Sequence, residues 1–105
     1  MRKPSVKCAL LAAMIAEHRW GSPIAEENLL AISAIETSDY PTASDVFDTL
    51  RSAPYVTNRG KRGIELNSGG FGELADLLHH ECEWEPFEIK SRLKHYEGWN
   101  EHEWV

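Results

Sequence analysis

Apolar residues recur at intervals of three and four near the N-terminus of this sequence, which is the spacing of a helix with one buried face. The pattern predicts a first helix over residues 5–18. Gly21 is expected to end it, because glycine is favoured just past helix C-termini. The residues that this helix is expected to bury are Leu10, Leu11, Met14 and Ile15.

A second helix is expected to begin at Ser22 and Pro23. Serine is a favoured N-cap, and proline is favoured at the first helical position. Residues 37–42 contain serine, aspartate and proline, and they predict a turn after this helix. The expected inner face of the second helix is Leu29, Ile32 and either Leu30 or Ile35.

The third predicted helix has the clearest apolar stripe. It spans residues 43–53, and Pro54 is expected to end it because the residue before a proline disfavours helical geometry. Four apolar residues fall at positions i, i+3, i+4 and i+7 and are expected to face the core: Ala43, Val46, Phe47 and Leu50.

The periodicity then changes from helical to strand-like. Residues 55–57 and 64–66 are β-favouring, and residues 58–63 between them are rich in glycine and positive charge. This pattern predicts a β-hairpin with a basic tip that carries Arg59, Lys61 and Arg62.

The C-terminal third predicts two more helices, over residues 71–82 and 86–96, followed by an acidic, aromatic tail at residues 98–105. We therefore expect a mainly α fold with one two-stranded β-hairpin, in a single domain covering residues 1–105. Residues 68–72 are expected to form a flexible joint with an N-cap at Ser68 or nearby. The inward residues expected here are Phe71, Leu74, Leu77 and Leu78 in the first helix and Phe87, Ile89, Leu93 and Tyr96 in the second.

Composition narrows the class of protein. The chain has 105 residues, of which 42% are hydrophobic and 27% charged, as in ordinary globular domains. No apolar run is long enough for a membrane span, and the basic start before Cys8 is not expected to be an export signal, because helical periodicity continues into Glu17. Two cysteines are too few for a disulfide scaffold, so we expect Cys8 to pack as a small apolar residue and the protein to be cytoplasmic.

The net charge of −6 is unevenly distributed along the chain. Residues 20–50 and 70–105 are acidic, whereas residues 1–19 and 51–69 each carry an excess of three positive charges. An acidic protein usually repels nucleic acid, but a local basic patch can still bind it, because phosphate contacts act over about a Debye length of 8–10 Å.

The order of three helices and a hairpin resembles the winged helix-turn-helix superfamily, here with extra C-terminal helices after residues 5–67. The resemblance rests on the stripe of residues 43–50, on Pro54 and on the hairpin of residues 55–66. Residues 56–64 also look like a segment of small archaeal proteins. The resemblance implies that the third helix enters the major groove of DNA, that the hairpin forms a wing along the backbone, and that the protein regulates transcription.

Eight residues are the expected DNA contacts. Serine, threonine and arginine on the third helix suit base edges and phosphates, and the basic wing tip suits phosphates. Asp45 and Asp48 on the same helix do not suit phosphates, so the alternative is a protein-interaction module on the same fold. The expected DNA contacts are Ser44, Thr49, Arg51, Ser52, Asn58, Arg59, Lys61 and Arg62.

No residue pattern predicts an enzyme, a cofactor or a metal centre. His79 and Cys82 could share a helix face, but a second ligand pair with suitable spacing is lacking. Residues 68–72 lack the ending of a phosphate-binding P-loop.

The aromatic C-terminus leaves two alternatives open. The first helix and the aromatic segment could form a homodimer, since tryptophan is enriched at interfaces, or the tail could pack within its own chain. The aromatic residues concerned are Trp84, Tyr96, Trp99 and Trp104.

Overall fold

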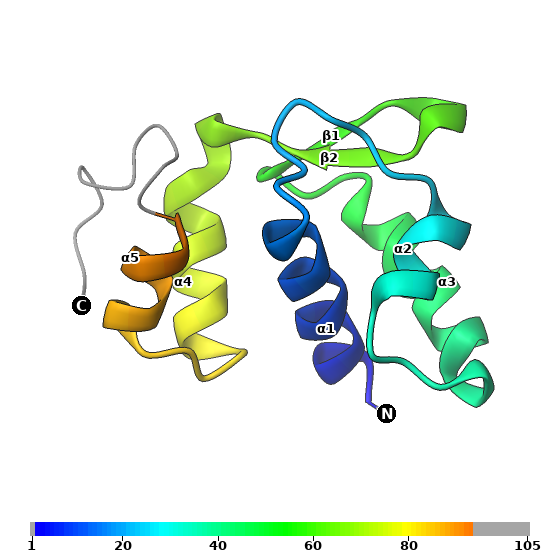
Figure 1. Cartoon of the computed structure of the whole chain (residues 1–105), viewed down its shortest axis with the longest axis horizontal. Coiled ribbons are helices and arrows are strands. Elements are labelled where there is room, and N and C mark those ends of the chain that lie inside the picture. Colours follow the sequence, from blue (N-terminus) through cyan, green and yellow to red (C-terminus); the bar gives the residue numbers. More distant parts are fainter. Residues whose placement is uncertain (1, 94–105) are drawn as a thin grey trace.

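A computed structural model describes residues 2–93, which form five α-helices and one two-stranded antiparallel sheet (Figure 1). The mainly helical fold with a hairpin is therefore confirmed for this part of the chain. The helices are α1 (Lys3–Ala16), α2 (Glu26–Ile32), α3 (Tyr40–Leu50), α4 (Phe71–His80) and α5 (Pro86–Leu93). The strands are β1 (Val56–Asn58) and β2 (Ile64–Leu66), and the short 3₁₀ turns are η1 (Thr37–Asp39), η2 (Gly60–Arg62) and η3 (Ser68–Gly70).

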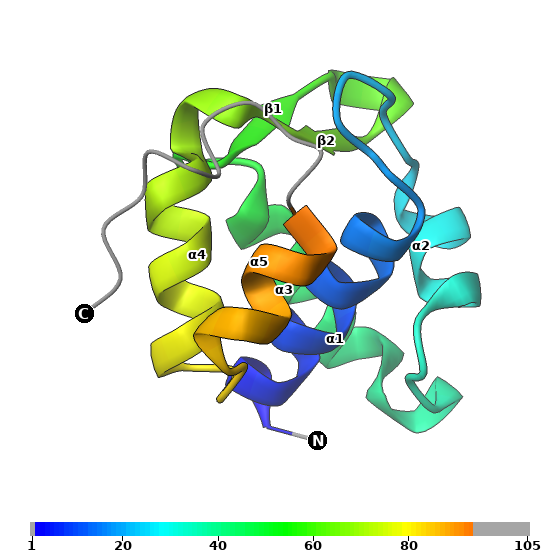
Figure 2. The ribbon, with the colours of Figure 1, turned by 60° about the vertical axis from the view of Figure 1, so that its left-hand side comes forward.

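Helix α1 is the centre of the fold. It lies between α2 and α3 on one side and α4 and α5 on the other, with the sheet across one end (Figures 1 and 2). Its apolar face is fully covered by its own chain, so α1 does not offer the apolar dimer surface that the sequence suggested. Tyr96, Trp99 and Trp104 lie outside the described residues. The fully buried residues of α1 are Val6, Leu10, Leu11 and Met14.

The end of α1 differs from the prediction that Gly21 stops it. His18 takes a left-handed conformation with φ 54°, and its amide donates to Ile15 O while the Arg19 amide donates to Met14 O. These two bonds satisfy carbonyls of the last turn in the manner of a Schellman cap. Histidine supplies the left-handed residue here, three positions before the glycine.

The segment before α2 is extended, so the prediction that Ser22 and Pro23 begin that helix is wrong. The Ile24 amide donates to Ile64 O at 2.9 Å, and the Ile64 amide returns a bond to Ile24 O at 3.1 Å. This pairing satisfies the second edge of β2, which outweighs the local preference for a helix start. Helix α2 begins at Glu26 instead, and Ile32 is 46% exposed rather than inward.

Helix α3 begins earlier than predicted. The expected turn at residues 37–42 is η1 followed by the first turn of α3, and Pro41 lies in that first turn, where a missing amide hydrogen costs nothing. Its predicted stripe is confirmed, because Ala43, Val46, Phe47 and Leu50 are all buried.

The hairpin is confirmed, with Val56 opposite Leu66 and Asn58 opposite Ile64. In β2 buried and exposed positions do not alternate, because Glu65 is only 3% exposed. The pairing of Ile24 covers one edge of β2, and Arg59 covers the Glu65 carboxylate. The hairpin shares one buried cluster with α1 and α3, which contains Leu11, Met14, Ile15, Val46, Phe47, Leu50, Val56, Ile64 and Leu66.

The cap expected at Ser68 or nearby, before helix α4, is Asn67. Asn67 caps the turn, since its side-chain oxygen accepts from the Gly70 amide at 2.9 Å. A Cβ on Gly70 would lie 2.4 Å from the Tyr55 Cα, so glycine is required by the close approach of two backbones. In α5, Ile89 and Leu93 are buried as predicted, whereas Phe87 is 78% exposed.

Cys8 and Cys82 form a disulfide that ties α1 to the turn after α4. The expectation that Cys8 is a free thiol packed as a small apolar residue is therefore wrong. Spacing alone could not reveal the pair, because 74 positions separate the two residues in sequence. Beside the disulfide, Lys7 forms an ion pair with Glu81 at 3.0 Å. Within residues 2–93, no helix has the length and apolar character needed to cross a membrane.

The protein is expected to lose stability above about pH 10, because its folded state resists ionisation of Tyr55. Burial raises the pKa of Tyr55 above its ordinary value, and the charges of Glu81 and Glu73 raise it further. Because the pKa of Tyr55 is raised only in the folded state, stability is intact at pH values below the pKa of this tyrosine in the unfolded chain. Stability is lost as the pH rises above that pKa. Urea unfolding from pH 8 to 11 should show the decline, and the Tyr55→Phe variant should show a shallower one.

Candidate nucleic-acid interface

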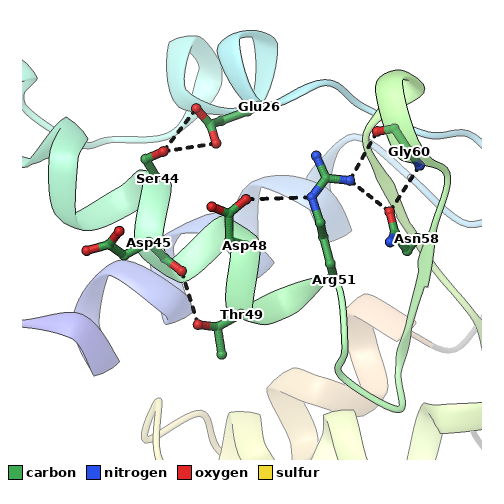
Figure 3. Close-up of polar contacts among 8 residues, drawn as sticks. All are labelled: Glu26, Ser44, Asp45, Asp48, Thr49, Arg51, Asn58 and Gly60. Atoms are coloured by element: carbon green, nitrogen blue, oxygen red, sulfur yellow. Dashed lines mark hydrogen bonds and ion pairs between the residues drawn. The ribbon is translucent and has the colours of Figure 1, made fainter.

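The eight expected DNA contacts lie on two adjoining elements, helix α3 with its C-terminal turn and the wing, defined here as residues 55–66. Figure 3 shows that Arg51 connects them. The structure therefore brings the predicted residues together on neighbouring parts of the fold, although it engages most of them within the chain.

Arg51 contacts both elements. Its Nη1 donates to the Asn58 side-chain oxygen at 2.8 Å and to the Gly60 carbonyl at 3.0 Å. Its Nε lies 3.7 Å from Asp48, and its guanidinium carbon lies 4.9 Å from the centre of the Phe47 ring. Arg51 is thus held against the wing.

Arg59 is paired with the buried Glu65. Both Nε and Nη2 lie 2.5 Å from one Glu65 carboxylate oxygen. The Glu65 side chain is 4% exposed and that of Arg59 is 50% exposed. A buried carboxylate needs a compensating positive charge, so Arg59 is committed to Glu65 and adds little net charge to the wing.

Lys61 and Arg62 differ from the two arginines described above. Both lie exposed on η2 at the wing tip, and neither side chain has a hydrogen bond, ion pair or ring contact with any residue from 2 to 93. They are the positive charges of the wing that no described residue compensates. Glycines on either side, Gly60 and Gly63, shape the turn through positive φ values of 62° and 104°.

The outward side of α3 carries hydroxyl groups and acidic side chains. The Ser44 hydroxyl donates to Glu26 at 3.2 Å, and the Thr49 hydroxyl donates to the Asp45 carbonyl at 3.0 Å. Asp45 and Asp48 are exposed, as is the predicted contact Ser52. The hydroxyls expected to contact DNA therefore already have acceptors within the chain.

A second basic region borders α3 from the other side. A surface cavity of about 170 Å³ lies between the start of α1 and α3. The excess positive charge of residues 1–19 had indicated a basic region in this part of the chain. Asp45 lines the same cavity and places a negative charge beside the two lysines. The cavity is lined by Lys3, Pro4, Lys7, Asp45, Val46 and Thr49.

The candidate metal ligands are used in other contacts. His79 Nδ1 lies 2.9 Å from the Trp84 carbonyl, and Cys82 is in the disulfide. In the part of the chain that the structure describes, no group of three or more histidine, cysteine or acidic residues could hold a metal ion.

Comparison of the chain with protein-family models, curated proteins and solved structures finds no match. Its function therefore has to be argued from its own residues.

Proposed function

We propose that this protein binds double-stranded DNA through the wing tip, with α3 lying alongside the duplex. The observation that carries the proposal is the pair of exposed cations at the tip, Lys61 and Arg62, whose side chains have no partner among residues 2–93. Side chains of this kind at a projecting turn suit contacts with phosphate oxygens. The resemblance to winged helix-turn-helix domains adds support, because three helices followed by a hairpin occur here in that order.

Binding is proposed to depend more on the DNA backbone than on its sequence. The hydroxyls of Ser44 and Thr49 are engaged within the chain, which leaves fewer free donors for base edges. Phosphate contacts position a protein without carrying sequence information. We propose a regulatory role in the cytoplasm without a cofactor, with any sequence preference supplied by the remaining polar groups of α3.

The double variant Lys61→Ala/Arg62→Ala is expected to weaken binding about equally for every duplex sequence. Each lost phosphate contact should reduce the slope of log K against log salt by about 0.9. Fluorescence anisotropy with two unrelated duplexes, each at several salt concentrations, measures both effects. The matched control is Lys90→Ala/Arg92→Ala, which removes the same charge from α5, on the side of α1 away from α3 (Figure 1).

An unchanged affinity and salt slope in the wing variant would contradict the role of the wing tip. Equal effects of the wing and α5 variants would indicate a dependence on net charge alone. If the parent protein binds no duplex at low salt, the DNA proposal fails.

A second candidate is a protein-interaction module, and the exposed Asp45 and Asp48 on α3 favour it. Both acids would repel phosphate, and Asp45 lies in the lining of the cavity beside Lys3 and Lys7. A protein partner with a basic surface fits them better. If that candidate holds, Asp45→Asn/Asp48→Asn should abolish partner capture by the tagged protein, whereas for a DNA-binding protein it should strengthen duplex binding.

The homodimer remains a proposal that involves the C-terminal aromatic residues, because α1 is covered within the chain. Light scattering at increasing protein concentration tests it. A mass that stays monomeric would remove it.

A further inference from the structure

Arg51 occupies the junction between α3 and the wing, and its contacts suggest a role different from base recognition. One nitrogen, Nη1, serves two acceptors on the wing: the Asn58 side chain at 2.8 Å and the Gly60 carbonyl at 3.0 Å. The rest of the side chain is anchored on α3, over the Phe47 ring and near Asp48. A planar guanidinium suits this arrangement because its donors point in fixed directions.

Asn58 completes the junction. Its side-chain oxygen accepts both from Arg51 and from the Gly60 amide at 3.0 Å. Gly60 itself meets nothing within 4 Å at its Cβ position, so the backbone there projects into open space. The tip is thus connected to α3 through one arginine and one asparagine (Figure 3).

We propose that Arg51 is a positioning residue, which fixes the wing tip relative to α3 so that Lys61 and Arg62 are held in one place. The inference deepens the proposed DNA binding and rests on it for its consequence in affinity. Its structural part, the fixed tip, can be tested in the free protein. Arg51 acts through Asn58 and Gly60, and a direct contact with a base or phosphate is not part of the role.

The structural test uses amide hydrogen exchange at Gly60 in the free protein. Arg51→Ala and Asn58→Ala are each expected to speed this exchange by about tenfold. The first variant loses a hydrogen bond from a charged group, and the second loses the oxygen that accepts from the Gly60 amide. The double variant should be little faster than either single variant, because both remove the same connection. Asn58→Asp keeps an acceptor oxygen, and its charge strengthens the bonds from Arg51 and Gly60, so its exchange should be no faster than in the parent.

The binding test separates positioning from direct contact. A positioning role predicts that Arg51→Ala weakens binding to two unrelated duplexes by the same factor, with the parent's salt slope retained. A phosphate contact would lower the slope by about 0.9, and a base contact would weaken one sequence selectively. Arg51→Lys keeps the charge without the planar donors, so positioning predicts that it does not rescue affinity.

Exchange at Gly60 that is unchanged in Arg51→Ala would overturn the inference whatever the DNA result, because Asn58→Ala removes the amide's own acceptor and speeds exchange in either case. A lower salt slope, a selective loss for one duplex, or rescue by lysine would also overturn it. Failure of the parent protein to bind DNA would instead defeat the proposed function, and the exchange data would still decide whether Arg51 fixes the tip.

Discussion

Replacing Gly63 with alanine is expected to destabilise the protein by about 4 kcal/mol or more, which is a large part of the stability of about 5–15 kcal/mol that is typical of a folded domain. A Cβ at this position would lie 1.8 Å from the Ile24 carbonyl oxygen and 2.4 Å from its carbon. The backbone has φ 104° and ψ −140°, a region that only glycine adopts readily. Neither problem can be relieved by a side-chain movement, because the obstacle is backbone.

Gly60 is the matched control in the same turn. Its φ is also positive, at 62°, but an added Cβ would meet nothing within 4 Å. Gly60→Ala should therefore cost about 1–2 kcal/mol for the left-handed conformation alone. Urea unfolding followed by circular dichroism measures both variants. Equal losses would show that the segment around Ile24 does not approach β2 as closely as described.

The importance of Gly63 also shows where sequence-based prediction reached its limit. The glycines around the basic tip predicted a turn, and the turn is present. What no local pattern revealed is that residues 19–24 pair with the other edge of β2. Ser22 and Pro23 satisfy the local rules for a helix start, and a contact with a strand 40 residues later overrides those rules.

The helical periodicity was more informative, because it depends on burial along one face. The α3 stripe and the buried residues of α1 follow directly from it. It failed at Phe87, where the short helix α5 buries Ile89 and Leu93 and leaves the ring outside. An eight-residue helix has few turns to define its buried face, so one apolar position can fall on either side.

The candidate site could be located from the sequence but its residues could not be ranked. The charge pattern identified a basic segment, whereas the pairing of each charge depends on the fold. Arg59 and Lys61 look equivalent in sequence, yet one neutralises the buried Glu65 and the other is exposed without a partner among the described residues. The same holds for Arg51, whose acceptors lie seven and nine positions away.

Loss of the Cys8–Cys82 disulfide is expected to be the other large effect on stability. The bond joins residues 74 positions apart, and closing a loop of that length removes entropy from the unfolded chain equivalent to about 4 kcal/mol. The variant Cys8→Ser/Cys82→Ser should lose most of this amount. It should also show a steeper dependence of the free energy of unfolding on urea, since the unfolded chain becomes less compact.

Lys7→Ala provides the control at the same junction. It removes the ion pair with Glu81, which joins the same two elements but is partly exposed, and such pairs contribute about 0–1 kcal/mol. Mass spectrometry after thiol alkylation, performed with and without prior reduction, establishes that the bond is present in the parent protein. If the serine variant is as stable as Lys7→Ala, the disulfide is not what holds α1 to the turn after α4.

The same bond bears on where the protein works. Disulfides persist in oxidising compartments and also inside hyperthermophilic cells, whereas in an ordinary cytoplasm they are reduced. Alkylation of Cys8 and Cys82 in intact cells, before lysis, therefore tests the proposed cytoplasmic location. Two blocked thiols would place the protein in a reducing compartment, where it would have to fold without the expected 4 kcal/mol or so. An intact bond would require an oxidising compartment or a hyperthermophilic host, and only the second agrees with DNA binding in the cytoplasm.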